Sequence, residues 1–276
     1  MAIKYLLCFC CFIECISCQV TKAQVDILSE KNDTCEIVSS SKFFEVDRFG
    51  NIYVPNEKNE ILKYASGGRI IFTYANSRNG NITSIDATNP MKLLVFYDDF
   101  NKVIWLDNSL SQIASLDLEP IFSDITSAAT SNDGGIWLYS PIQNKLFKTT
   151  IHGEILRSSN NLSDFGITNL QIYKIMERNN HVIILTDDNR ALIFDNFAQF
   201  TQVKHLDDYQ AIDVFDDVLY YIVEGKIHST ELINIAEENH NVVFQSIPLE
   251  KVNYIRITKQ AIYYLSDNCI YRFDLN

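Results

Sequence analysis

The feature that most constrains the fold is a short apolar segment that recurs along the chain at intervals of about 42 residues. Its six copies are NIYVP (51–55), LLVFY (93–97), GIWLYS (135–140), HVIILT (181–186), VLYYI (218–222) and AIYYLS (261–266). The gaps between successive anchor residues, Ile52, Leu94, Ile136, Val182, Val218 and Ile262, are 42, 42, 46, 36 and 44. Near-constant spacing of this kind indicates a repeat architecture, in which each unit packs against its neighbours.

Each unit predicts four short strands. A second apolar run follows every anchor after 8 to 10 residues, as in ILKYA (61–65) and CIYRFD (269–274). A further apolar run precedes each anchor, and another follows the second run in the first five units. Turn residues such as Gly50-Asn51 and Asn79-Gly80 separate them. Four strands in about 40 residues is typical of a β-propeller blade, so the sequence predicts an all-β, six-bladed β-propeller.

The sixth unit contains only three strands, because the sequence ends at Asn276. An unpaired last strand would expose a row of backbone N–H and C=O groups. We therefore expect an N-terminal strand to complete the last blade and close the ring. Two segments are candidates for that strand, VDILSE (25–30) and CEIVSS (35–40).

The two candidates place the cysteines differently. Five of the seven cysteines lie within the first eighteen residues, which leaves Cys35 and Cys269. If residues 25–30 form the closing strand, Cys35 follows its end and can reach Cys269 in a disulfide. If residues 35–40 form it, we expect about five residues at ~3.3 Å each to separate the thiols, too far for a bond. The sequence leaves both alternatives open.

The N-terminus has the layout of a secretory signal peptide. Lys4 precedes an apolar run over residues 5–13 that is too short to span a bilayer. Cleavage after Ala23 would release a single propeller domain over residues 24–276. The competing site, ISCQ (16–19), is similar to a bacterial lipobox and would place a lipid on Cys18. We expect an exported protein, in the periplasm or held at the cell envelope by a lipid anchor, with no transmembrane segment.

The formal net charge of −12 bears on partners. An excess of this size repels phosphate, so nucleic acid and anionic membrane surfaces are poor partners. We expect a monomer.

The first unit, VDRFGNIYVPNEKNEILKYASGGRIIFTYAN (46–76), resembles an NHL-type propeller repeat, with Asp47, the Gly50-Asn51 turn and Gly67-Gly68. This resemblance implies six blades. Residues 80–110 are similar to a group of exported bacterial propeller proteins of unknown function, which brings no assigned catalytic residues.

No catalytic, cofactor-binding or metal-binding motif emerges from the sequence. The five histidines share no metal-ligand spacing; they are His152, His181, His205, His228 and His240. Residues 75–86 echo a calcium loop, but Ala75 stands where the first carboxylate ligand is required. Acidic pairs recur near blade turns, at 98–99, 187–188, 207–208 and 216–217. We interpret them as turn-stabilising side chains; in the alternative interpretation, some line a channel mouth and bind calcium.

Aromatic residues recur at the anchors, and we expect most of them to fill the space between blades; if several lined one face instead, they would form a peptide or glycan site. These are Tyr53, Phe96, Tyr97, Trp105, Trp137, Tyr139, Tyr220, Tyr221, Tyr263 and Tyr264. The resulting hypothesis is a non-enzymatic scaffold that binds an envelope protein or an extended ligand, peptide or glycan, on one propeller face. The alternative is a calcium-dependent hydrolase of the lactonase type.

Overall fold

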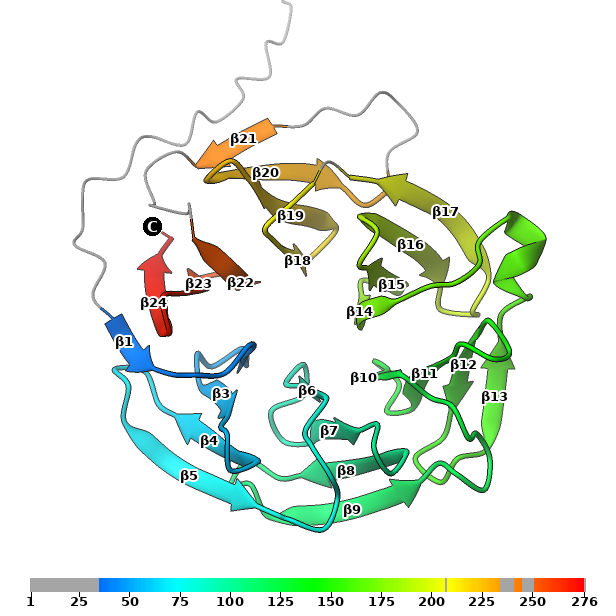
Figure 1. The fold of residues 1–276 in the computed structure, drawn as a ribbon, viewed down its shortest axis with the longest axis horizontal. Helices are drawn as coiled ribbons and strands as arrows, with labels where there is room; N and C mark the ends of the chain where they lie inside the picture. Colours follow the sequence, from blue (N-terminus) through cyan, green and yellow to red (C-terminus); the bar gives the residue numbers. More distant parts are fainter. Residues whose placement is uncertain (1–34, 207, 234–240, 245–250, 276) are drawn as a thin grey trace, which may run out of the picture.

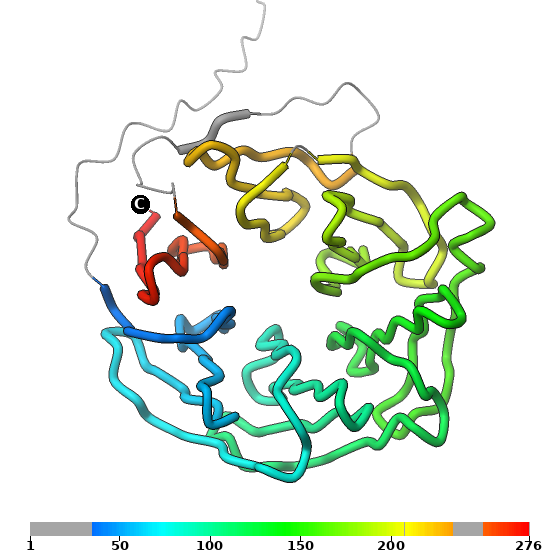
Figure 2. Tube along the Cα trace, in the orientation of Figure 1, coloured from blue at the N-terminus to red at the C-terminus, as the bar shows by residue number. Residues whose placement is uncertain are grey.

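The computed structural model describes residues 35–206, 208–233, 241–244 and 251–275. Their strands form six antiparallel sheets of four strands each, arranged as blades around a central axis (Figure 1). The chain passes round the ring once, and its first and last described strands lie side by side (Figure 2). The predicted six-bladed, all-β fold is confirmed.

Within each blade, the first strand lies nearest the axis and the fourth lies at the rim. Blade 1 contains β2 (Glu45–Val46), β3 (Ile52–Pro55), β4 (Glu60–Tyr64) and β5 (Ile70–Ala75). Blade 2 contains β6 (Ser84–Asp86), β7 (Leu93–Tyr97), β8 (Lys102–Leu106) and β9 (Gln112–Asp117). Blade 3 contains β10 (Ser127–Thr130), β11 (Ile136–Ser140), β12 (Lys145–Thr149) and β13 (Ile155–Ser158).

A short 3-10 helix, η1 (Leu162–Phe165), leads into the second half of the ring. Blade 4 contains β14 (Ile172–Arg178), β15 (His181–Thr186), β16 (Arg190–Asp195) and β17 (Phe200–His205). Blade 5 contains β18 (Ala211–Phe215), β19 (Val218–Val223), β20 (Lys226–Glu231) and β21 (Asn241–Phe244). Blade 6 contains β22 (Val252–Ile257), β23 (Ala261–Ser266), β24 (Cys269–Asp274) and β1 (Cys35–Val38).

The core lies between blades rather than within them. Six clusters of buried apolar side chains occur among the described residues, and each draws on two adjacent blades. The repeated aromatics fill this space: all of them except Tyr220 are buried. The packing interpretation is therefore confirmed, and the alternative, in which these rings line one binding face, is wrong.

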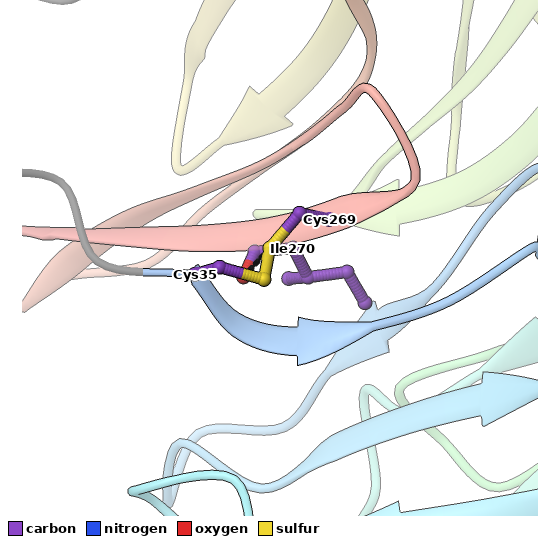
Figure 3. Close-up of a disulfide and its surroundings, with 3 residues drawn as sticks. All are labelled: Cys35, Cys269 and Ile270. Atoms are coloured by element: carbon purple, nitrogen blue, oxygen red, sulfur yellow. Dashed lines mark hydrogen bonds between the residues drawn. A yellow bond between two sulfur atoms is a disulfide. The ribbon is translucent and has the colours of Figure 1, made fainter.

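β1 closes the ring by pairing antiparallel with β24, so the sheet order of blade 6 is β1-β24-β23-β22. A disulfide joins Cys35 to Cys269 with a Cα–Cα distance of 5.7 Å (Figure 3). The expectation that a strand at 35–40 holds these thiols too far apart is wrong. The strand has only four residues, and a register shift between Cys35 and Ile37 brings Cys35 close to Cys269.

The seam between blades 6 and 1 is tightly packed beside this disulfide. Gly68 lies in the turn between β4 and β5 with φ +75°, and a Cβ there would approach the carbonyl oxygen of Glu36 to 2.4 Å. Arg272 on β24 donates from Nη1 to Ser66 Oγ in the same turn at 2.7 Å. The first blade therefore packs directly on the strand that closes the last one.

The predicted signal peptide, its cleavage after Ala23 and the lipobox ending at Cys18 lie outside the described residues. In the part of the chain that the structure describes, no helix is long and apolar enough to cross a membrane.

Candidate functional site: the central channel

Four charged side chains from the innermost strands of four blades meet at the axis of the ring. Lys174 Nζ on β14 donates to Glu45 Oε1 on β2 at 2.6 Å. Arg256 on β22 binds the same carboxylate through two hydrogen bonds, from Nε to Oε2 at 2.9 Å and from Nη2 to Oε1 at 2.7 Å. Its Nη1 lies 3.2 Å from Asp213 Oδ1 on β18. We call Glu45, Lys174, Asp213 and Arg256 the waist network, because together they cross the channel and link blades 1, 4, 5 and 6.

In the waist network, the attraction between opposite charges acts against the effect of burial on the carboxylate. Burial by itself would raise the pKa of the Glu45 carboxyl, but the charges and hydrogen bonds of Arg256 and Lys174 outweigh it and hold the pKa at about 2. Burial lowers the pKa of Lys174, and the nearby Arg256 charge lowers it further. Glu45 therefore stays ionised at any physiological pH and cannot act as a proton carrier.

The sequence contains a signal for this network that the search for motifs missed. In four blades a charged residue stands between apolar residues of the innermost run: FFEVD, QIYKIM, AIDVF and NYIRIT. A charge inside an innermost strand has either to face the axis or to be buried between blades. These four face the axis, where they meet partners from other blades.

The waist network separates two cavities. The larger, of ≈ 430 Å³, lies where the innermost strand of each blade (A) ends and turns into the second strand (B). We therefore call it the A–B mouth. The smaller, of ≈ 210 Å³, lies at the other end of the innermost strands, beside Lys42, Thr83, Tyr173 and Asn253. Glu45 lines both cavities, and its partners Arg256 and Lys174 line one cavity each, so the waist network lies between the two.

The other acidic side chains of the A–B mouth are Asp47 and Glu177. Both are buried, and both accept hydrogen bonds from neutral donors. Asp47 accepts from the Tyr53 hydroxyl at 2.9 Å and from the Asn51 side chain at 2.8 Å. Glu177 Oε2 accepts from Ser131 Oγ at 2.7 Å and also from the indole N–H of Trp137. These carboxylates line the mouth, and their hydrogen bonds anchor the turns around it.

The acidic pairs that the sequence analysis singled out lie elsewhere. Asp188 stabilises its own turn, where its Oδ1 accepts from Arg190 Nε at 2.9 Å, whereas Asp98 Oδ1 accepts from Thr83 Oγ1, ahead of β6, at 2.6 Å. None of their described members lines either cavity, and Asp207 lies outside the described residues. The interpretation as a turn residue is confirmed for Asp188, and the alternative that the pairs line a channel mouth is wrong for their described members.

The histidines do not converge either. His228 stacks on Tyr221 with ring centroids 5.5 Å apart, and His181 is half-buried. His152 and His205 are exposed, and His240 lies outside the described residues. Within the described ranges, no group of three or more His, Cys, Asp or Glu side chains is placed to hold a metal ion.

No protein-family model matches the chain, and no curated protein is similar to it in sequence. The NHL likeness of the first blade therefore stays a resemblance. Solved structures share the fold. A streptogramin B lyase structure aligns with a TM-score of 0.60 at 14% identity, over 84% of this chain and 82% of that chain.

Two further structures are similar. A catalytically inactive virginiamycin B lyase from Staphylococcus aureus with quinupristin gives a TM-score of 0.56 at 14% identity, over 84% of this chain and 80% of that chain. BamB from Moraxella catarrhalis gives a TM-score of 0.47 at 11% identity, over 83% of this chain and 70% of that chain. At 14% identity the likeness to the two lyase structures defines the class of protein, a β-propeller, and nothing of its activity.

Proposed function

We propose that the protein is a non-enzymatic binding scaffold that receives a segment of an extended ligand in the A–B mouth. The observation that carries this proposal is the waist network at the inner end of the mouth: a ligand that enters the mouth meets these four charged side chains. A cavity of ≈ 430 Å³ falls within the size range of ligand sites and is far too small for a folded domain. A ligand must therefore offer a loop, a terminus or a short chain.

The chemistry of the mouth supports binding over catalysis. An acid or base catalyst needs a pKa near the working pH, whereas the pKa of Glu45 is held at about 2. A calcium-dependent hydrolase needs convergent carboxylate oxygens that are available to the ion. Both Glu45 oxygens and both Asp213 oxygens already accept hydrogen bonds from protein N–H groups.

The place of action in this proposal is the cell envelope. The Cys35–Cys269 disulfide supports export, because such bonds persist in oxidising compartments. A mature chain beginning at Gln24, or a lipid on Cys18, would leave the ring outside the cytoplasm. The partner would then be an envelope protein, or a peptide or glycan presented there, bound by a monomer.

Site-specific photocrosslinking tests this proposal. A photoreactive amino acid replaces Gln260 or Asn132, two exposed residues that line the A–B mouth, in the chain expressed with its own N-terminus. The same amino acid at Lys58, an exposed residue in the turn between β3 and β4 on the opposite face, is the control. We expect both mouth positions to give the same discrete adduct and Lys58 to give none. Equal adducts at all three positions, or none at any, would contradict the proposal.

A further inference from the structure

Three basic side chains surround the A–B mouth without an acidic partner. Arg48 follows β2, Arg178 ends β14 and Lys259 follows β22, so they come from blades 1, 4 and 6. Arg48 and Lys259 are exposed, and Arg178 is half-buried. In the described part of the chain, none of the three forms a salt bridge. This is notable in a protein whose net charge is −12.

Arg178 is also held in position. Its Nη1 donates to Thr88 Oγ1 at 3.2 Å and to the Glu177 carbonyl oxygen at 2.8 Å, and no described residue accepts from its Nε or Nη2. Arg48 lies over the ring of Phe49, with the guanidinium carbon 5.0 Å from the ring centroid. A guanidinium that is fixed in this way loses less conformational entropy when it binds a carboxylate.

Behind these three side chains the waist network is neutral, and two buried carboxylates add negative charge. In the waist network, Glu45 and Asp213 balance Lys174 and Arg256. Asp47 and Glu177 add two negative charges, but their described hydrogen-bond partners are neutral donors within the turns. The exposed charged side chains that line the cavity, Arg48 and Lys259, are positive, and the exposed Asp217 lies beside the cavity as the acceptor of Asn179.

The remaining rim groups suit an extended peptide. Asn132 and Gln260 are exposed amides that line the cavity between the basic residues, and Asn179 beside them donates from Nδ2 to Asp217 Oδ2 at 3.0 Å. An amide both donates and accepts, so it can bind the N–H and C=O groups of a backbone. Phe49, which is 62% exposed, adds an apolar contact at the edge of the mouth.

We propose that the ligand of the A–B mouth is an extended acidic peptide segment whose carboxylates bind Arg48, Arg178 and Lys259. This inference rests on the proposed function and deepens it by naming the ligand chemistry. Long polyanions such as nucleic acid experience the repulsion of the whole −12 protein. A short segment feels mainly the rim, because salt screens charges beyond about 8 Å at physiological ionic strength.

Binding of a fluorescently labelled peptide that alternates Glu and Gly, measured by anisotropy, tests the inference. The variants are Arg48→Gln, Arg178→Gln and Lys259→Gln, singly and together, with Lys58→Gln on the opposite face as the matched control. A charge-assisted hydrogen bond contributes about 1.5 kcal/mol or more, so each single variant should weaken binding about tenfold. The triple variant should abolish measurable binding, whereas Lys58→Gln should bind like the parent protein. Thermal melting of each variant separates loss of contact from loss of fold.

Competitors identify the ligand class. Unlabelled Glu-Gly peptide should displace the probe, and a Gln-Gly peptide of the same length should not. Displacement by citrate or inorganic phosphate at the same concentration as the peptide would overturn the peptide assignment, as would stronger displacement by a single-stranded oligonucleotide. If the probe does not bind while Gln260 still photocrosslinks a partner, the acidic ligand is wrong and the proposed function stands; if both fail, both are wrong.

Discussion

Glu45 and Lys174 lie on blades that face each other across the ring, and the Lys174 ammonium donates to the Glu45 carboxylate at 2.6 Å. Residues 129 positions apart in the sequence thus form a bridge across the channel. With Arg256 and Asp213, this bridge lies between the two cavities of the channel. It also ties opposite sides of the ring together, which the packing of adjacent blades cannot do.

The waist network predicts loss of stability in acid. The pKa of Glu45 is about 2 in the folded protein, against an ordinary value of 4.5. A folded-state pKa that is depressed contributes stability above pH 4.5, and that contribution is lost as the pH falls from 4.5 towards 2. The part due to Glu45 amounts to about 3 kcal/mol at neutral pH. The titration of the Glu45 carboxyl carbon, followed by NMR, should have its midpoint near pH 2, and a midpoint near 4.5 would contradict this assignment.

We expect the disulfide to stabilise the closed ring. It links residues 234 positions apart, so it restricts almost the entire unfolded chain. The double variant Cys35→Ser, Cys269→Ser should lose about 2–4 kcal/mol of unfolding free energy, measured by urea denaturation. Each single variant should lose a similar amount. A reducing agent should destabilise the parent protein but not the double variant; equal sensitivity of the two would show that the bond is absent in solution.

The close packing at Gly68 predicts that any side chain there destabilises the seam between blades 6 and 1. Gly67 and Gly68 both have positive φ, so alanine at either position strains the backbone by about 1–2 kcal/mol. Only at Gly68 does a Cβ collide with backbone, the Glu36 carbonyl, since nothing lies within 4 Å of a Cβ at Gly67. Gly68→Ala should therefore be the more destabilising by at least about 1 kcal/mol, an overpacking cost, in thermal or urea unfolding. Equal losses in the two variants would mean that the seam is not closed as described.

Calcium provides a test of the alternative hydrolase hypothesis. Because protein N–H donors already occupy the oxygens of Glu45 and Asp213, we expect millimolar calcium to leave the melting temperature unchanged. An ion that binds the native state selectively raises the melting temperature. A clear rise that disappears in Asp213→Asn would restore the hydrolase hypothesis.

Much of the fold could be predicted from the sequence. The near-constant spacing of the anchors and their second runs predicted six four-stranded blades, because strand alternation and turn residues are local properties. The truncated last unit likewise predicted closure by an N-terminal strand. The choice between residues 25–30 and 35–40, and with it the disulfide, depended on a local register shift at Cys35, which no composition or periodicity encodes.

The site was decided by tertiary structure alone. Glu45, Lys174, Asp213 and Arg256 are single charges in separate strands, and a motif search looks for neighbours in sequence. The same holds for Arg48, Arg178 and Lys259. Ring closure brings the ends of all six innermost strands around one axis, and only that long-range geometry turns isolated charges into a bridge and a rim. Local chemistry determined the blades, and the closed circle determined which side chains meet.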